Sequence, residues 1–491
     1  MKVVLANPPA YYDDHHRHFI QAGSRWSFSM FVSPGMKEHY LPYPFLEGYG
    51  LSILKQNGIE SVGIDACAFD MDKKEFVSKI VSSKPDLLVV DIPTISFPLT
   101  IPLLGEIRRQ VDCKIAVAGG HITSLASETL KQHGVIDYAL LGEYEFSLLA
   151  LAKELEKGSS TSIDDLAGVA FRKGDEILVK RPSVQKFNLD EMPYPDRKDY
   201  PIELYHDFEI AGRPCVQMLT SLGCPYKCSF CMPIRVMNQD SPLYRRRDPQ
   251  KIVDEMSYAK DELGAKQVYF DDDTFSVDKS RLREMSRVIR ESQLDLPWTA
   301  MGDITIDEET IRLMSNSGCA GIKFGVETAS TATLDGIHKT FMKIEKVKQF
   351  VKWLRKYGIW SHSTFIIGLP GDKREDILKT IEFSKKLDTD SVQFSIATPF
   401  PGTPFYEQAK QNGWLATDDW TQYDGANYAV LNYPDLSKGD IEDLHRLALK
   451  EWYRNALFKE IKHPRRIGRI IKAGSVRYSI RKTLSHLRGT L

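Results

Sequence analysis

The amino-acid sequence predicts an α/β protein with a doubly wound, Rossmann-like sheet, then a partial (β/α)6 barrel, then a mostly helical C-terminal region. Two series of short apolar segments alternating with amphipathic ones support this prediction. A connector containing Gly, Ser and Pro separates the two series. We therefore expect four units, at residues 1–157, 158–213, 214–405 and 406–491.

Composition and charge narrow the class of protein. The 491 residues are 42% hydrophobic and 27% charged, as in ordinary globular proteins. The 65 Lys and Arg residues nearly balance the 66 Asp and Glu residues, so we expect no nucleic-acid partner. No apolar run is long enough to span a membrane, and residues 1–7 resemble a buried strand more than a signal peptide. We therefore expect a cytoplasmic protein.

The first series predicts a parallel sheet with a ligand at one edge. Its strands are expected at 3–7, 61–65, 87–91, 114–118 and 138–141, and its helices at 48–56, 73–82, 103–110, 125–132 and 146–156. Doubly wound sheets bind ligands at the carboxyl ends of their strands. The candidate ligand-binding residues at those ends are Asn7, Pro8, Thr94, Gly119, Gly120, His121, Gly142 and Glu143. The first turn has no GxGxxG motif, which argues against a dinucleotide.

The connector and the second series predict a hairpin and a barrel. Two short strands, 169–172 and 176–180, flank a Lys-Gly-Asp turn. Barrel strands are expected at 217–222, 267–270, 298–300, 321–326, 364–367 and 391–397. Asp248 is expected to cap the first barrel helix, and Thr305 with Glu308 to form a capping box for the third. In such barrels the active site lies at the carboxyl ends of the strands.

Three of the seven cysteines lie within eight residues, directly after the first barrel strand. Cys224, Cys228 and Cys231 have CxxxCxxC spacing, and such thiolates can hold one iron–sulfur cluster with one iron left open. Zinc is an alternative that needs a fourth ligand, and the nearest histidine, His206, is distant in sequence. Three inert buried thiols are the other alternative. The remaining cysteines are expected to be packed thiols: Cys67, Cys113, Cys215 and Cys319.

This spacing, with an aromatic residue before the third cysteine, resembles the radical S-adenosylmethionine (SAM) superfamily. The resemblance implies a 4Fe–4S cluster whose open iron binds the amino and carboxylate groups of SAM, and a 5′-deoxyadenosyl radical that takes hydrogen from a substrate. It also implies SAM contacts from Phe230, Asp272, Asp273, Glu327, Gly368 and Pro370. Among these, Glu327 would accept hydrogen bonds from the ribose hydroxyls.

The sheet that precedes the barrel resembles the cobalamin-binding subgroup of that superfamily. The similar segments are Pro42-Tyr43-Pro44, 119–123 and 142–145. The resemblance implies that the strand-end residues of the first sheet hold the corrin ring. Asp13 and His15 match part of a D-x-H-x-x-G axial-ligand motif without its glycine. We therefore expect cobalamin without a histidine lower ligand.

Together these features imply a cobalamin-dependent radical SAM enzyme. We expect C-methylation of an unactivated carbon in a small-molecule or lipid-type substrate, with an external one-electron reductant of flavodoxin or ferredoxin type. A radical SAM and cobalamin cyclase or oxidoreductase without methyl transfer is the alternative, and a non-catalytic cobalamin or cluster sensor is a weaker one. A methylthiotransferase would need further N-terminal cysteines, but only Cys67 and Cys113 are present. No motif identifies the substrate.

The C-terminal tail is strongly basic. Residues 459–488 contain ten Lys or Arg and one acid, Glu460. Aliphatic residues recur among them at helical spacings: Ile467, Ile470, Ile471, Leu484 and Leu487. A basic amphipathic helix is typical of a membrane-surface element, so peripheral contact with the inner membrane face is one hypothesis. A helix packed against the barrel is the second, and a nucleic-acid contact is the third.

Overall fold

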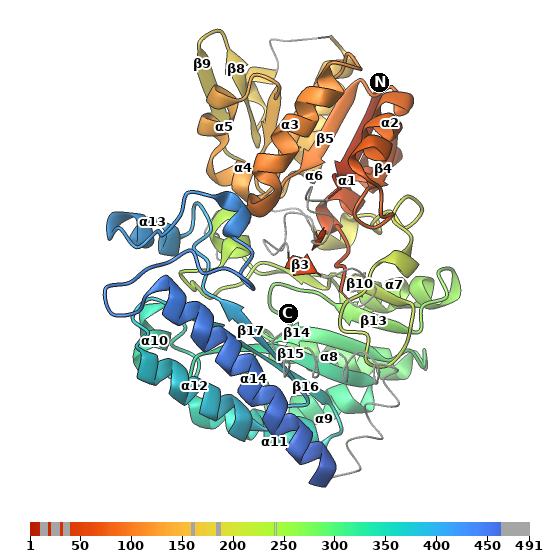
Figure 1. The fold of residues 1–491 in the computed structure, drawn as a ribbon. Helices are drawn as coiled ribbons and strands as arrows, with labels where there is room; N and C mark the ends of the chain where they lie inside the picture. The colour runs from red at the N-terminus through yellow and green to blue at the C-terminus, as the bar shows by residue number, and fades with distance from the viewer. Residues whose placement is uncertain are drawn as a thin grey trace.

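A computed structural model describes residues 1–9, 18–20, 30–32, 40–158, 163–182, 188–239, 241 and 243–462. The described chain contains a seven-stranded and a six-stranded sheet, and two sheets of two strands each. The seven-stranded sheet and its helices form the upper half of Figure 1, and the barrel forms the lower half. Within these ranges no helix is both long and apolar enough to cross a membrane.

The first sheet has the strand order β4-β1-β5-β6-β7-β8-β9. Its strands are β1 Lys2–Asn7, β4 Glu60–Asp65, β5 Leu87–Asp91, β6 Lys114–Ala118, β7 Tyr138–Leu140, β8 Val169–Lys173 and β9 Glu176–Lys180. The first five are parallel, so the order reverses between β1 and β5. This is the doubly wound arrangement expected from the sequence, and its switch point is the usual place for a ligand.

Both faces of this sheet are buried, because neighbouring residues of each strand enter different hydrophobic cores. In β1, Val3 and Leu5 join one core, and Val4 and Ala6 join the other. Helices α1 Phe45–Gln56 and α6 Glu145–Glu156 cover the first face. The opposite face is covered by α2 Lys73–Ser83, α3 Phe97–Arg108 and α5 Ala126–Gln132. A short helix, α4 Gly120–Ser124, follows β6.

The hairpin expected within the connector is part of the first sheet. Strands β8 and β9 pair with each other, and β8 pairs antiparallel with β7. The chain then returns toward the barrel. On the way, Tyr200 and Tyr205 are buried in the core of the first sheet. The connector is therefore packed against folded structure along most of its described length.

The second sheet has the order β10-β13-β14-β15-β16-β17 and is parallel throughout. Its strands are β10 Cys215–Met218, β13 Gln267–Phe270, β14 Trp298–Gly302, β15 Cys319–Glu327, β16 Trp360–Ile367 and β17 Ser391–Ile396. The helices between them are α7 Pro249–Asp261, α8 Lys279–Glu291, α9 Glu308–Asn316, α10 Thr331–Gly336, α11 Ile344–Lys356 and α12 Arg374–Leu387. Strands β10 and β17 lie at opposite edges, so the barrel is partial, as predicted.

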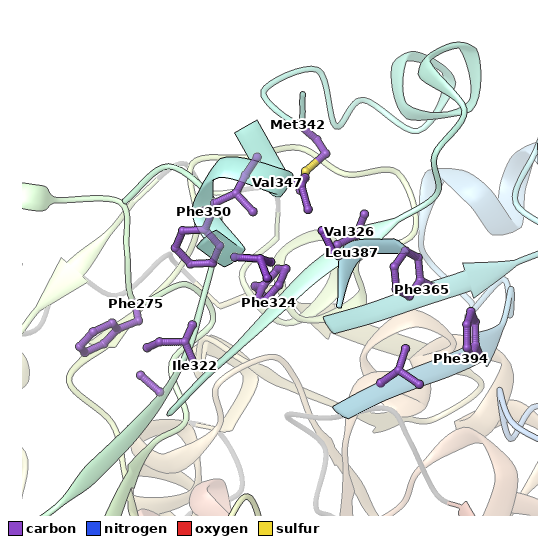
Figure 2. Packing of buried hydrophobic residues seen from close by; sticks show 14 of the residues in the cluster. Phe275, Ile322, Phe324, Val326, Met342, Val347, Phe350, Phe365, Leu387 and Phe394 are labelled. Carbon is purple, nitrogen blue, oxygen red and sulfur yellow. The ribbon is translucent and has the colours of Figure 1, made fainter. Parts of the chain in front are cut away.

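The barrel wall has a covered outer face and a more open inner face. Ile322, Phe324 and Val326 of β15 point outward into the helical layer, where Phe324 meets Phe350 of α11 (Figure 2). Lys323 and Gly325 alternate with them and are partly exposed. Strand β16 alternates in the same way along all eight residues. The barrel therefore encloses a lumen lined by inward-facing residues.

Two local predictions were wrong. The strand expected at 217–222 is divided: β10 ends at Met218, and β11 Ser221–Leu222 pairs antiparallel with β12 Arg245–Arg246. Asp307, not Thr305, caps α9, because its carboxylate accepts a hydrogen bond from Thr310 N at 2.9 Å. Asp248 does cap α7, as predicted.

The C-terminal region contains α13 Pro404–Gln411 and the long helix α14 Lys438–Lys462. Helix α14 packs against α12 and β17 (Figure 1). Most of the basic tail, from residue 463 onward, lies outside the described residues, as do Asp13 and His15.

Candidate active site

The cysteine loop begins at a corner held by two carboxylates. Asp272 accepts hydrogen bonds from Thr220 N at 2.7 Å and from Ser221 Oγ at 2.6 Å, and Asp273 accepts one from Gly223 N at 2.7 Å. Gly223 has φ +91°, and a Cβ there would lie 2.0 Å from the carbonyl oxygen of Leu243. The two acids predicted to contact SAM thus lie at the base of the cysteine loop and fix its direction.

The three cysteine thiols lie close enough to interact electrostatically. Burial raises the pKa of Cys231 to about 12, with a further contribution from Cys228. Burial also raises the pKa of Cys224 and of Cys228, although the Lys339 ammonium opposes the shift at Cys228. Free thiols in this environment are protonated at neutral pH, so metal binding would release protons.

The donor set fits an iron–sulfur cluster. Nowhere in the described ranges do three His, Cys, Asp or Glu side chains lie where they could share one metal ion. An iron–sulfur cluster does not need three side chains around one ion, because each thiolate binds a separate iron atom. Arg235 supports the loop, since its Nε donates to the carbonyl oxygen of Cys228 at 3.1 Å. Phe230, which precedes the third cysteine, packs against the barrel core.

Glu327 ends β15 and forms a buried ion pair with Lys339. The Lys339 ammonium contacts Glu327 Oε1 and donates to the Gly325 carbonyl oxygen at 3.1 Å. Burial lowers the pKa of Lys339, but Glu327 and the nearby Cys228 raise it more, so the net shift is upward. A Cβ at Gly325 would lie 2.3 Å from Glu327 Oε1, so the ion pair occupies the space beside this glycine. Lys339 could not be predicted as a site residue, because no local sequence pattern distinguishes it from a surface lysine.

Gly368 and Pro370 lie in a loop that two other parts of the chain hold in place. Gly368 has φ +86°, and its carbonyl oxygen accepts a hydrogen bond from Tyr433 at 2.9 Å. Asp372 accepts hydrogen bonds from Leu369 N at 3.0 Å and from Thr333 Oγ1 at 2.9 Å. Burial raises the pKa of Asp372 from 3.8 to about 7. The backbone of this loop is therefore fixed before any ligand binds.

The carboxyl edge of the first sheet contains buried polar atoms without partners. Thr94 Oγ1 and His121 Nδ1 have no hydrogen-bond partner within the described part of the chain. Burial lowers the pKa of His121 to about 3, so this histidine is neutral. Its ring lies between Phe97, at 4.4 Å, and Trp420, at 5.2 Å, measured between ring centroids. Unpaired buried polar atoms are costly, so they fit a polar ligand at this edge.

The other predicted residues of this edge contact neighbouring segments. Asn7 donates to Asp65 at 3.1 Å, and Pro8 beside it is buried. Gly119 has φ +114°, and a Cβ there would lie 2.9 Å from the Ile92 carbonyl oxygen. The loop after β6 therefore passes close to the loop after β5, and only glycine fits at this position.

The same loops touch the segment that follows the third cysteine. A Cβ at Gly120 would lie 2.3 Å from Met232 Sδ, so Met232 packs directly on this glycine. Helix α4 packs against a π-helix, Pro233–Met237, and a Cβ at Gly142 would lie 3.0 Å from the Met237 carbonyl oxygen. Glu143 forms an ion pair with Arg245 at 2.6 Å. The structure thus brings the predicted cobalamin loops against the cluster loop.

The Pro42-Tyr43-Pro44 segment connects the two sheets. Tyr43 N donates to Gln217 Oε1 of β10 at 2.8 Å, and the Tyr43 hydroxyl donates to the Asp196 carbonyl oxygen at 2.5 Å. The Arg197 guanidinium lies 3.7 Å from the centre of the Tyr43 ring. This segment therefore positions the first barrel strand relative to the first sheet.

Comparisons with known proteins agree with this geometry. The family model described as the radical SAM superfamily matches residues 218–384. An uncharacterized methyltransferase of Pyrococcus horikoshii is 30% identical over 393 residues, which are 79% of this chain and 83% of that protein. The anaerobic magnesium-protoporphyrin IX monomethyl ester cyclase of Rubrivivax gelatinosus is 25% identical over 423 residues, which are 84% of this chain and 73% of that protein.

Among solved structures, the radical SAM methyltransferase TsrM from Kitasatospora setae, with cobalamin and a [4Fe-4S] cluster bound, has a TM-score of 0.65. It is 20% identical, and the match covers 85% of this chain and 79% of that protein. This likeness shows that the two chains share a fold. The cysteine loop, the family model and the Pyrococcus relative together show that this chain is an enzyme of the radical SAM superfamily, with the two-sheet fold of a cobalamin-dependent member.

Proposed function

We propose that this chain is a radical SAM methyltransferase that uses cobalamin to methylate an unactivated carbon. The observation that carries the proposal is the direct packing of the predicted cobalamin loops, at Gly120 and Gly142, against the segment that follows Cys231. Two cofactor sites formed by these segments would lie beside one another, as transfer between them requires. The names of the Pyrococcus relative and of TsrM support methyl transfer.

The chain's own residues would bind, orient and shield the reactants. When bound, the cluster would supply an electron to SAM, and cobalamin would carry the methyl group. Cys224, Cys228 and Cys231 would hold three irons of the cluster. Glu327 would accept hydrogen bonds from the ribose hydroxyls, and the Lys339 ammonium would face the SAM carboxylate. The electron would come from an external reductant of flavodoxin or ferredoxin type.

The first sheet would hold the corrin at its carboxyl edge. Thr94 and His121 would give hydrogen bonds to polar groups of the ligand, and the glycines at 119 and 120 would let the loop after β6 pack against Ile92 and Met232. We expect no histidine below the cobalt. Electron paramagnetic resonance of the cob(II)alamin form tests this, and nitrogen superhyperfine splitting from an imidazole would contradict it.

Deuterated-methyl SAM tests the proposed reaction. The loaded enzyme, given substrate and reductant, should form labelled product, S-adenosylhomocysteine and 5′-deoxyadenosine together. Formation of 5′-deoxyadenosine with an unlabelled product would contradict methyl transfer. That result would favour the cyclase or oxidoreductase alternative, which the similarity to the Rubrivivax cyclase supports.

Contact with a membrane surface is a separate part of the proposal, and it depends on the basic tail. Each basic residue near an anionic leaflet contributes about 1 kcal/mol of attraction. Vesicles containing anionic lipid should sediment the full chain at low salt and leave a truncation after Phe458 in the supernatant. Equal behaviour of the two forms would remove the tail as an argument for a lipid-type substrate.

A further inference from the structure

The inner face of the barrel carries a row of mostly polar side chains. Met301, Lys323 and His362 are neighbours on β14, β15 and β16, and Thr364 and Gln393 are neighbours on β16 and β17. All five are at least partly exposed, whereas the residues between them are buried against the helices. The lumen wall on this side is therefore accessible, and three of its four strands present polar groups.

A segment of the connector closes the amino-terminal end of the lumen. Gln267 holds it, because its Oε1 accepts from Ala211 N at 2.7 Å and its Nε2 donates to the Phe208 carbonyl oxygen at 2.8 Å. A Cβ at Gly321 would lie 2.4 Å from Ile210 Cδ1, so Ile210 packs directly on that glycine. This packing brings the neighbouring Asp207 to the lumen floor.

Lys323 and Asp207 form an ion pair at this floor. The Lys323 ammonium also lies 4.9 Å from the ring centre of Tyr269, 5.2 Å from that of Phe208 and 6.0 Å from that of Tyr40. An ammonium group has three hydrogen-bond donors, and the ring faces stabilise its charge without taking strong hydrogen bonds. Among the described residues, Asp207 is the one hydrogen-bond acceptor of the ammonium, so donor capacity remains on Lys323, whose side chain is 13% exposed.

Lys323 and Glu327 lie on the same strand and face the same side. Four residues of strand span about 13 Å, and Gly325 between them contributes no side chain. The lumen thus extends from the proposed SAM level to a floor where the Lys323 ammonium is paired with Asp207. On the basis of the proposed function, we infer that the methylated substrate is a polar small molecule whose anionic group, a carboxylate or a phosphoryl group, binds Lys323 at the barrel floor.

Fractionation of a cell extract tests the substrate class. An extract of the cells that make the protein is divided into an organic lipid phase, an aqueous fraction retained on an anion-exchange resin and an aqueous fraction that is not retained. Each is incubated with the loaded enzyme and deuterated-methyl SAM. We expect a labelled compound other than SAM and methionine in the retained fraction. Such a compound only in the lipid phase or the unretained fraction would overturn the inference, whereas 5′-deoxyadenosine with no such compound in any fraction would contradict the proposed function instead.

Substitutions at the ion pair separate substrate binding from a purely structural role. Lys323→Met should raise the apparent KM for the labelled fraction about ten- to a hundredfold, and Lys323→Arg should restore much of it. Asp207→Asn should lower that KM or leave it unchanged, because it removes a carboxylate that competes for Lys323. Iron content and SAM binding confirm that each variant is folded, and the exposed Lys343→Met is the matched control. An equal rise in KM for Lys323→Met and Asp207→Asn would show that the pair only ties the floor to β15.

Discussion

The two sheets of this molecule expose their strands in different ways. In β5 of the first sheet all five residues are buried, because helices cover both faces. In β16 of the barrel, buried and partly exposed residues alternate, because only the outer face is covered. A ligand can therefore reach the first sheet only at its edge, whereas the barrel offers both an edge and an inner wall.

This difference explains the chemistry of each site. At the edge of the first sheet the candidate residues are mostly glycines and short polar side chains in loops, such as Thr94 and Gly119. In the barrel, charged residues such as Glu327 and Lys323 lie within the strands themselves. The edge of the first sheet therefore offers a ligand mainly backbone and short polar groups, whereas the barrel offers charged side chains as well.

The largest expected effect is the loss of SAM cleavage and iron when cysteines of the barrel, but not of the first sheet, are replaced. Replacing Cys224, Cys228 or Cys231 with Ala should abolish SAM cleavage and remove most of the iron, because three thiolates are the minimum set for the cluster. Cys113→Ala, in the core of the first sheet, should keep both. Iron analysis measures the iron content of each variant, and 5′-deoxyadenosine assays measure its SAM cleavage. Full 5′-deoxyadenosine production by Cys228→Ala would contradict the cluster assignment.

The next effect concerns stability and is confined to the barrel. Because the pKa of Asp372 is raised to about 7 in the folded protein, its stabilising contribution is present below about pH 4 and is lost as the pH rises through 7. Between pH 5 and pH 8 this loss should approach about 3 kcal/mol.

Asp372→Asn should remove that pH dependence, which urea unfolding at the two pH values would show. Asp443→Asn, at an exposed position of α14, should unfold like the unsubstituted protein. The same pH dependence in Asp372→Asn and in the original chain would show that this carboxyl is not its source.

A smaller effect tests the proposed SAM contact. Glu327→Gln should weaken SAM binding by roughly 1.5–3 kcal/mol, because a charge-assisted hydrogen bond is lost while the side-chain shape is kept. Glu143→Gln, at the edge of the first sheet, should leave the SAM dissociation constant unchanged. Calorimetric titration of SAM compares the dissociation constants of the two variants and the original protein. Equal affinities for Glu327→Gln and the original protein would mean that Glu327 serves only as the partner of Lys339.

The smallest expected effect concerns two buried threonines beside the first sheet. Their substitution with Val should change the free energy of unfolding in opposite directions. Thr94→Val removes a hydroxyl without a partner and should stabilise the cofactor-free protein by about 1 kcal/mol, yet reduce cobalamin retention. Thr100→Val removes a hydroxyl that donates to the Ser96 carbonyl oxygen at 2.9 Å, and should destabilise by about 1 kcal/mol. Urea titration and cobalamin absorbance after gel filtration measure both effects. Destabilisation by Thr94→Val with full cobalamin retention would contradict a ligand at this edge.

Local patterns predicted most of the fold. Apolar runs such as 87–91 and 114–118 coincide with β5 and β6, because a strand buried on both faces can be predicted from its run of apolar residues. Prediction failed in two places. Ser221–Leu222 leaves the barrel sheet to pair with residues more than twenty positions later, which is a long-range contact. At α9 the failure is local, because Asp307, two residues after Thr305, accepts the hydrogen bond from Thr310 N.

The sequence by itself determined the two α/β units, the cysteine loop and the glycines at strand ends, because each depends on neighbouring residues. Only the tertiary structure decided which charges meet. Lys339 pairs with Glu327, Lys323 with Asp207 and Arg245 with Glu143. Each pair joins separate segments of the chain, the last two across more than a hundred residues. Ion pairs form wherever packing brings opposite charges together in a buried place, and no local pattern in the sequence encodes that position.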